Sequence, residues 1–305
     1  MSISKMNDLT VIIPTFNRSQ ELIRALDSLS LQIDPDFDVI VCDDGSSENI
    51  RTVVLGYEHK LRIRYFRSEP SQGPGSARNV GIESAKTTWV SFLDSDDWWL
   101  PSRIKHIREL LVDEFDVVYH QLQVERLDKS IRAVPRHGLL MGSQIYGPDT
   151  VSAMILRGNP LATSATTVRR QLIYDVGCFN TSTCLIGVED FECWMRLAIQ
   201  GARFKFLPKA LGSYFVGGSQ LSTMDSLHYK RYLNLYKSFL DILPEPYNSL
   251  AQSKYSYQLG VLALRVDQAI AKDHFRQLSM LRQPLLYFKG ILRLWQFKSH
   301  HFLAS

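Results

Sequence analysis

The sequence is poor in cysteine and has no long apolar run. Its four cysteines, at positions 42, 178, 184 and 193, show neither CxxC spacing nor the density of a disulfide-stabilised domain. No stretch of about 18 apolar residues is present that could span a bilayer, and residues 1–8 lack the apolar core of a signal peptide. We therefore expect a reduced, cytoplasmic chain that is neither exported nor integral to a membrane.

Acidic residues are also missing from the end of the sequence. None follows Asp273, whereas five basic residues do: Arg276, Arg282, Lys289, Arg293 and Lys298. The segment 284–298 is in addition rich in aromatic and aliphatic side chains. Such a segment can lie in a membrane interface, which would bring the chain to the inner face of the membrane. It can equally form a helix that packs on the protein while its cations reach solvent.

What is present indicates an α/β protein. With 305 residues, 45% hydrophobic and 22% charged, the chain can form one large domain or a domain with an appendage. Apolar, β-branched runs cover 9–14, 37–42, 63–66 and 88–93, and segments of helical periodicity between them cover 19–32, 47–57 and 75–84. This alternation predicts a doubly wound, mainly parallel sheet whose ligand crevice lies at the carboxyl ends of the strands.

The pattern is less regular after residue 100. We expect a helix over 101–111, a strand over 117–120, and mixed loops and short strands to about residue 168. Further along, a helix is expected over 188–200, a strand over 204–207, and helices from 227 onward, including 255–271 and 284–297. The change to continuous helical periodicity places a domain boundary near Asp225.

Three carboxylates follow the fourth predicted strand, at Asp94, Asp96 and Asp97. Burying an ionised carboxylate is costly unless it is paired or binds a metal. Asp94 and Asp96 are alternate residues, so an extended segment would turn both toward one Mg²⁺ or Mn²⁺ ion. Asp-rich turns also form because Asp accepts hydrogen bonds from nearby backbone donors. We expect Asp97 to cap the helix that begins near Pro101.

Polar residues follow the other predicted strands as well. Asp44 comes directly after the second strand, where its carboxylate can accept the imide N–H of a uracil ring. The alternative is an ordinary turn before a helix that Ser46 or Ser47 caps. Thr15 and Asn17 follow the first strand in the same way.

A glycine-rich turn, residues 73–79, leads into a helix that carries Arg78 in its first turn. Its backbone N–H groups and the guanidinium form a reasonable diphosphate cradle. It is not the dinucleotide-binding fingerprint, because Arg78 stands where the third glycine is needed. Alternatively, Arg78 pairs with an acid such as Glu83 or one of the acids in 94–97.

Two adjacent acids, Glu189 and Asp190, open an amphipathic helix. Negative residues in a first helical turn are favoured by the helix dipole, so a purely structural role is open. The functional alternative makes Asp190 a general base that removes a proton from an acceptor hydroxyl, with Glu189 beside it in the acceptor pocket.

These motifs together resemble family 2 glycosyltransferases of the GT-A fold. The matching segments are Val11–Asn17, Val41–Ser46, Gly75–Asn79, Phe92–Asp97 and Gly187–Asp190, in the order and approximate spacing of that family. The similarity covers roughly residues 9–222. It implies a catalytic domain at 1–225, with a nucleotide-sugar half at about 1–100 and an acceptor half at about 101–225. Residues 226–305 then form a helical extension.

The resemblance implies an inverting, metal-dependent hexosyltransferase. It would move one sugar from a nucleotide diphosphate donor, usually a UDP-sugar, to an acceptor hydroxyl of a saccharide or lipid-linked saccharide. Thr15 and Asp44 would contact the base, Asp94 the ribose or donor sugar, Asp96 the Mg²⁺ or Mn²⁺ ion, Arg78 the donor side, and Asp190 would be the catalytic base. Pro14, Asn17, Gly75, Ser95 and Glu189 complete the substrate-binding set. Such enzymes assemble cell-surface polysaccharide, lipopolysaccharide or glycolipid.

The sequence departs from the family pattern at two positions. Many relatives have Arg where this chain has Phe215 and His where it has Gly217, which puts a third protein metal ligand in doubt. The processive signature after the catalytic acid is also absent, so addition of a single sugar is expected. Two other functions stay open: a sugar nucleotidyltransferase, and a non-catalytic nucleotide-sugar-binding protein. The first is disfavoured because no Gly-rich basic loop follows the first strand.

Overall fold

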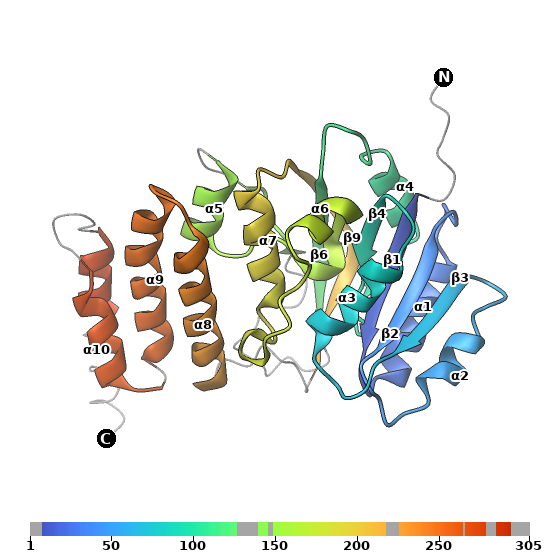
Figure 1. Ribbon diagram of the computed structural model, residues 1–305, viewed down its shortest axis with the longest axis horizontal. Helices are drawn as coiled ribbons and strands as arrows, with labels where there is room; N and C mark the ends of the chain where they lie inside the picture. The colour runs from blue at the N-terminus through green and yellow to red at the C-terminus, as the bar shows by residue number, and fades with distance from the viewer. Residues whose placement is uncertain are drawn as a thin grey trace. The chain divides into compact units, whose positions relative to one another are not determined.

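Figure 1 shows the computed structural model of the chain. It describes residues 8–126, 140–145, 149–217, 226–264, 266–278 and 285–293. The chain forms two compact units, one from residues 1–146 and 159–220 and the other from residues 147–158 and 221–305. All the candidate catalytic, substrate-binding and metal-binding residues belong to the first unit.

The first unit is built on one sheet with the strand order β3-β2-β1-β4-β8-β6-β9-β5. In its first half, β1 (Leu9–Thr15) pairs in parallel with β2 (Asp38–Asp43) and β4 (Trp89–Phe92), and β3 (Arg62–Arg67) pairs in parallel with β2. Every residue of β1 is buried, as expected for a parallel strand that helices cover on both faces. The predicted α/β fold is confirmed.

The second half of the sheet is mixed. β8 (Thr166–Arg169) runs antiparallel to both β4 and β6 (Val117–Arg126). β9 (Phe204–Val216) runs parallel to β6, and the short β5 (Trp98–Trp99) is antiparallel to β9. β7 (Leu140–Met141) pairs with β6 away from the main order. The strands predicted at 117–120 and 204–207 exist but extend further, into β6 and β9.

Strand register brings three predicted strand ends together. Thr15 lies opposite Asp43, and Asp43 lies opposite Arg67. The helices that connect these strands are α1 (Ser19–Ser30), α2 (Ile50–Leu55) and α3 (Pro74–Ser84). The polar residues after the strands therefore meet at one edge, as the alternating pattern predicts.

Short helices complete the first unit. They are α4 (Arg103–Arg108), the 3₁₀ turn η1 (Thr163–Ala165), α6 (Arg170–Asp175), the 3₁₀ turn η2 (Thr183–Leu185) and α7 (Glu189–Ile199). On α7, Trp194 packs edge-on against Phe179 with ring centroids 5.6 Å apart, and Phe179 packs against Phe92 of β4 at 5.2 Å. This aromatic contact fixes the start of α7 relative to the end of β4.

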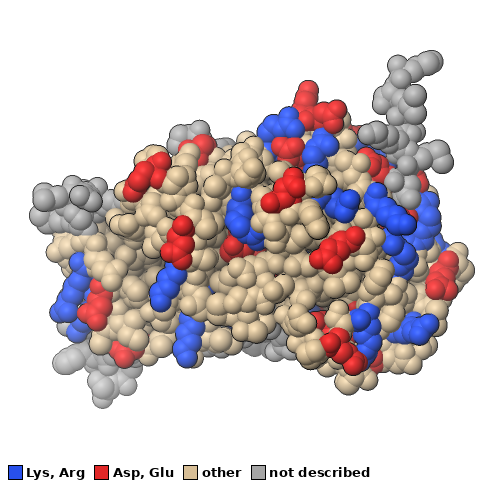
Figure 2. Space-filling view, in the orientation of Figure 1, with Lys and Arg blue, Asp and Glu red and all other residues tan. Residues whose placement is uncertain are grey.

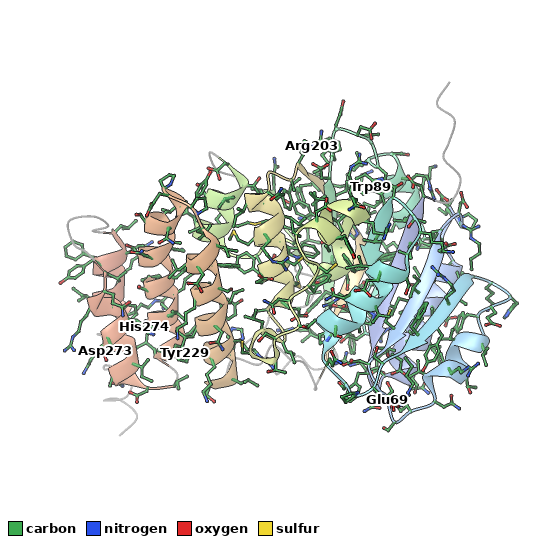
Figure 3. All side chains as sticks on the ribbon, in the orientation of Figure 1. Glu69, Trp89, Arg203, Tyr229, Asp273 and His274 are labelled. Atoms are coloured by element: carbon green, nitrogen blue, oxygen red, sulfur yellow. The ribbon has the colours of Figure 1, made fainter. Side chains whose placement is uncertain are left out.

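The second unit is helical. It contains α5 (Thr150–Arg157), α8 (Ser226–Ile242), α9 (Tyr247–Ala263) and α10 (Gln268–Arg276), and α9 contacts the other three. Tyr236 of α8 and Tyr255 of α9 stack with centroids 4.1 Å apart. The Tyr229 hydroxyl lies 2.9 Å from Nε2 of His274, joining α8 to α10 (Figure 3). Within the described residues, no helix is both long and apolar enough to cross a membrane.

Several predicted elements differ from the structure. The predicted helix 47–57 is shorter, because Asn49 rather than Ser46 or Ser47 caps α2 by accepting from the Thr52 N–H at 3.2 Å. The predicted helix 255–271 is wrong: α9 ends at Ala263, and Asp267 caps a new helix by accepting from the Ala269 N–H at 2.6 Å.

One further expectation is wrong, and another is confirmed over the part of its length that the structure describes. Helix α5, capped by Asp149, lies where loops and short strands were expected. Of the segment 284–298, residues 285–293 are helical, and the remainder lies outside the described residues.

Charged side chains of both signs are mixed over the face drawn in Figure 2, in keeping with a net charge of +4.

Candidate active site

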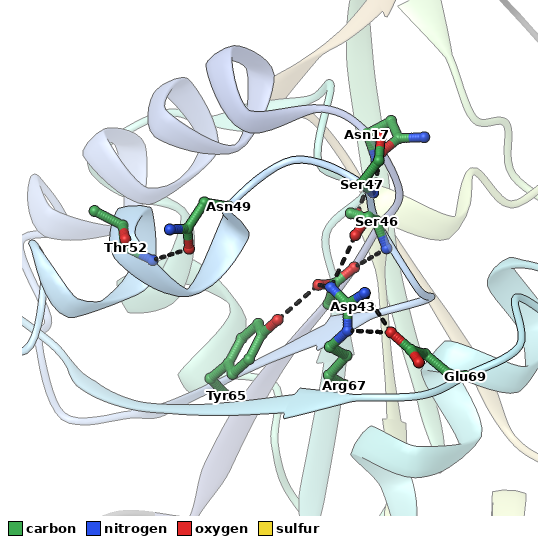
Figure 4. Close-up of polar contacts among 9 residues, drawn as sticks. All are labelled: Asn17, Asp43, Ser46, Ser47, Asn49, Thr52, Tyr65, Arg67 and Glu69. Carbon is green, nitrogen blue, oxygen red and sulfur yellow. Dashed lines mark hydrogen bonds and ion pairs between the residues drawn. The ribbon is translucent and has the colours of Figure 1, made fainter.

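Asp43 organises the loop at the end of β2 (Figure 4). Its buried carboxylate accepts hydrogen bonds from the Ser46 N–H at 2.9 Å, the Tyr65 hydroxyl at 2.6 Å and Nη1 of Arg67 at 3.1 Å. Arg67 also donates from Nε to Glu69 at 2.8 Å. Asp43 is therefore committed to holding the loop in place.

Asn17 connects the loops that follow β1 and β2. Its backbone has a left-handed φ of 52°, a conformation that Asn tolerates better than most residues. Its N–H donates to Ser46 Oγ at 2.9 Å, and its Oδ1 accepts from the Ser47 N–H at 2.7 Å. The geometry gives Asn17 a loop-joining role.

The residues just before Asn17 differ in exposure. Pro14 and Thr15 are buried in β1, and Thr15 Oγ1 has no hydrogen-bond partner among the described residues. Phe16 is 47% exposed at the end of the strand. Sequence reasoning gave Phe16 no role, although an exposed aromatic residue at a sheet edge is suited to stacking on a planar ligand.

Asp44 is buried and holds the loop before α3. Its Oδ2 accepts from Ser71 Oγ at 2.6 Å and from the Gly73 N–H at 2.8 Å, and its Oδ1 accepts from the Gln72 N–H at 2.9 Å. A carboxylate has about four acceptor positions, so one remains for a further donor.

Arg78 bridges two separate parts of the site. It is buried on α3 and donates from Nη2 to Asp94 Oδ1 at 2.6 Å and from Nη1 to Glu189 Oε1 at 2.9 Å. Gly75 allows this approach, because a Cβ there would lie 3.2 Å from both Glu189 Cγ and the Asn180 carbonyl oxygen. The partners of Arg78 are therefore Asp94 and Glu189, and Glu83 is not among them.

The acidic segment after β4 forms a turn. The Asp97 N–H donates to the Asp94 carbonyl oxygen at 3.0 Å, so the segment is a turn and not the extended segment on which the expected pairing of Asp94 and Asp96 was based. Ser95 is buried inside this turn. The Asp96 carboxylate pairs with Arg18, while its carbonyl oxygen accepts from Nη2 of Arg24 at 2.5 Å.

Asp97 does not cap the next helix. Its Oδ1 accepts from the Phe215 N–H at 2.8 Å, and α4 begins at Arg103 after Ser102. The turn directs Asp97 toward β9, where it binds backbone that β5 leaves unpaired. Burial, together with the charges of Asp96 and Asp94, raises the pKa of Asp97 well above its usual value.

Asp190 is the second residue of α7 and is half-buried. Its Oδ2 accepts from Asn159 Nδ2 at 3.1 Å and from Thr163 Oγ1 at 3.2 Å, and its Oδ1 accepts from the Phe191 N–H at 2.7 Å. Burial and the adjacent Glu189 raise its pKa to about 6, against the opposing effect of Arg78. A carboxylate with that pKa is largely ionised at neutral pH and can accept a proton.

Sequence reasoning missed Asn159 and Thr163. Both come from a stretch without helical or strand periodicity, where Gly158 and Pro160 signal only a loop. Their contact with Asp190 depends on pairings between distant parts of the chain, which the sequence pattern does not reveal.

Of the carboxylates in the turn, Asp96 is the candidate for holding a cation, since Asp94 pairs with Arg78 and Asp97 accepts from the Phe215 N–H. The Asp96 carboxylate already pairs with the guanidinium of Arg18, so a divalent ion bound there would have to replace that guanidinium. Across the described part of the chain, no three His, Cys, Asp or Glu side chains are grouped to hold a metal by themselves. A Mg²⁺ or Mn²⁺ ion fits such a site when phosphate oxygens and water complete its shell.

The family model described as glycosyl transferase family 2 matches residues 10–175, more than half of the 305-residue chain. An uncharacterised glycosyltransferase of Haemophilus influenzae is 27% identical over 191 residues, covering 62% of this chain and 61% of that protein. A GalNAc(5)-diNAcBac-PP-undecaprenol beta-1,3-glucosyltransferase of Campylobacter jejuni is 31% identical over 150 residues, covering 48% of each. The chain thus matches less than two thirds of either relative.

Solved structures share the fold. The S. aureus TarS 1–349 complex with UDP-GlcNAc matches with a TM-score of 0.66 and 20% identity over 97% of this chain and 92% of that one. A Pyrobaculum calidifontis mannosyltransferase bound to GDP-Man and Mn²⁺ matches with a TM-score of 0.59 and 16% identity, covering 96% and 82%.

The family match and the shared fold together show a glycosyltransferase of the GT-A fold. More narrowly, the chain belongs to glycosyl transferase family 2.

Proposed function

We propose that this chain transfers one sugar from a UDP-sugar to an acceptor hydroxyl with inversion at the anomeric carbon, using Asp190 as the base. The main support for this proposal is the position of Asp190. It lies beside Glu189, which Arg78 joins to the Asp94 turn at the carboxyl ends of the parallel strands. A proton acceptor thus borders the place where a nucleotide donor binds in sheets of this kind.

The base of the donor would bind between the ends of β1 and β2. Asp44 has an acceptor position left for the uracil imide N–H, and the unpartnered Thr15 hydroxyl supplies a second polar contact. The exposed ring of Phe16 supplies a stacking surface. A solved neighbour binds UDP-GlcNAc, which supports a UDP-sugar for this chain.

A divalent ion would be held by Asp96, with Asp94 nearby for the ribose or the donor sugar. When bound, the ion neutralises charge on the departing diphosphate. The Mn²⁺ in a solved neighbour supports this assignment. Arg18, now paired with Asp96, would exchange that carboxylate for the diphosphate as the donor enters.

The chemical step needs one proton acceptor and one leaving group. The acceptor oxygen forms a bond to the anomeric carbon while its proton passes to the Asp190 carboxylate. The bond from that carbon to the diphosphate oxygen breaks, and its electron pair leaves with UDP. Attack from the face opposite the diphosphate inverts the configuration.

The acceptor we favour is a lipid-linked saccharide. The Campylobacter relative is named for a reaction on an undecaprenol-linked glycan. In the helical stretch 285–293, Leu285, Phe288, Ile291 and Leu292 are 66%, 58%, 48% and 51% exposed, with Lys289 and Arg293 among them. These features support contact with an anionic membrane surface. Recovery of all the protein in the supernatant after sedimentation with anionic vesicles would oppose that contact.

A panel of nucleotide sugars, scored by release of the nucleotide diphosphate with and without Mn²⁺, tests the proposed function. We expect a UDP-sugar to give the fastest, metal-dependent release. Binding of UDP-sugars without transfer to any lipid or oligosaccharide acceptor would favour a non-catalytic binding protein instead.

A further inference from the structure

The 3₁₀ turn η1 contacts both halves of the proposed reaction. Thr163 donates from Oγ1 to Asp190 Oδ2 at 3.2 Å. The next residue, Ser164, accepts the Asp94 N–H at its Oγ with a distance of 3.0 Å. Two consecutive side chains therefore contact the candidate base and the backbone of the donor-side turn.

The turn itself is firmly held. Thr163 and Ser164 are 7% and 1% exposed, and the Ser164 carbonyl oxygen accepts from Trp99 Nε1 at 2.8 Å. The Thr166 hydroxyl closes the turn by donating to the Ala162 carbonyl oxygen at 2.9 Å. Directly after η1, β8 pairs with β4, the strand that leads into the Asp94 turn. A buried, cross-braced turn can fix the separation of the groups it contacts.

We propose that Thr163 and Ser164 are positioning residues, Thr163 orienting the Asp190 carboxylate toward the acceptor and Ser164 holding the Asp94 turn in register with it. This inference rests on the proposed role of Asp190. It adds a neutral connection between the acceptor and donor sides, separate from the charged bridge through Arg78.

Thr163 also affects the proton affinity of Asp190. A hydroxyl that donates to a carboxylate favours its charged form, and this hydrogen bond lowers the pKa of Asp190 against the larger effect of burial. The titratable and charged groups around Asp190 are Arg78 of α3, Tyr214 of β9, and Glu189 and Cys193 of α7. Replacement of Thr163 leaves all four of these residues in the sequence and removes only its own hydrogen bond to Asp190.

Thr163→Val tests the first half of the proposal, because it keeps the branched shape and removes the hydroxyl. For UDP release from the most active UDP-sugar, we expect kcat to fall roughly two- to tenfold. The acid limb of the kcat profile should move up by about half to one pH unit. Donor affinity measured by calorimetry should stay unchanged. Thr163→Ser restores the hydroxyl and should return the limb toward that of the wild type.

Ser164→Ala tests the second half and serves as the matched comparison. Loss of its oxygen removes the acceptor of the part-buried Asp94 N–H, so donor affinity should fall roughly two- to tenfold. The acid limb should stay where it is in the wild type. Thr163→Val thus moves the acid limb and leaves donor affinity unchanged, whereas Ser164→Ala lowers donor affinity and leaves the acid limb unchanged.

The inference is overturned if the Thr163→Val profile superimposes on the wild type, or if Thr163→Ser behaves like Thr163→Val. A different result would reject the proposed function: Asp190→Asn retaining turnover. Melting curves of all variants by circular dichroism separate these outcomes from loss of folding.

Discussion

At the residue scale, neighbouring carboxylates differ because their hydrogen-bond donors differ. Asp43 and Asp44 are adjacent, yet Asp43 accepts from Tyr65 and Arg67 of β3, while Asp44 holds the loop before α3 and keeps one acceptor position. In the turn after β4, Asp97 binds backbone and Asp96 binds a guanidinium. The sequence alone shows only a series of acids.

The pH dependence of transfer follows from Asp190. A base acts in its unprotonated form, and burial with Glu189 raises its pKa to about 6. The rate should therefore be level above that pH and fall roughly tenfold per pH unit below it. Initial rates of UDP release between pH 5 and pH 8 at saturating donor give the profile. A flat profile, with folding verified by circular dichroism at pH 5, would contradict the assignment.

Asp96 is the residue that we expect to bind the divalent metal ion. Asp96→Ala should weaken Mn²⁺-dependent binding of UDP roughly tenfold or more and leave metal-free binding nearly unchanged. Titration calorimetry with UDP, with and without Mn²⁺, measures both. Asp113→Ala, at an exposed carboxylate paired with Arg169, serves as the control and should bind like the wild type. Equal metal dependence in the Asp96 variant would remove Asp96 from the metal site.

Single residues could be predicted where a motif carried them. The motifs indicate Asp44, Asp94, Asp96 and Asp190 as candidate site residues, which stay predictions, and they do not include the partners Arg18, Asn159 and Thr163. Those partners lie far away in sequence, for example 78 residues between Arg18 and Asp96. Only the folded chain brings them together.

At the scale of elements, buried parallel strands were the easiest to predict, because continuous apolar runs define them. The ends of the helices were harder to predict, since they depend on single capping residues. Asn49 caps α2, which therefore begins later than predicted, and Asp267 caps a new helix after α9 ends. β6 and β9 extend past their predicted ends because each pairs with the other over nearly its whole length.

The loop after β2 should be sensitive to its central carboxylate. Asp43→Asn replaces one acceptor oxygen with an amide that cannot accept from both Tyr65 and Arg67, so we expect a loss of about 2 kcal/mol in the free energy of unfolding. Asp38→Asn, on the same strand, touches the half-exposed Arg62 and should cost less than about 1 kcal/mol. Urea unfolding of both variants measures these changes in the free energy of unfolding. Equal losses in the two variants would show that Asp43 does not organise the loop.

At the scale of the whole molecule, the alternating pattern predicted the α/β fold and the edge that bears the site. It did not predict the antiparallel pairing of β8 between β4 and β6, which brings η1 to the crevice. The sequence of a short strand such as β8 does not indicate which distant strands it pairs with. The proposed acceptor side of the candidate site therefore depends on topology more than the proposed donor side does.

We propose that donor binding and proton removal belong to different residues of one site. The Asp190→Asn variant tests this, when its donor affinity by calorimetry and its turnover by UDP release are compared with those of the wild type. We predict donor affinity within about twofold of the wild type and turnover lower by about 10²- to 10⁴-fold. Near-full turnover in this variant would contradict the account.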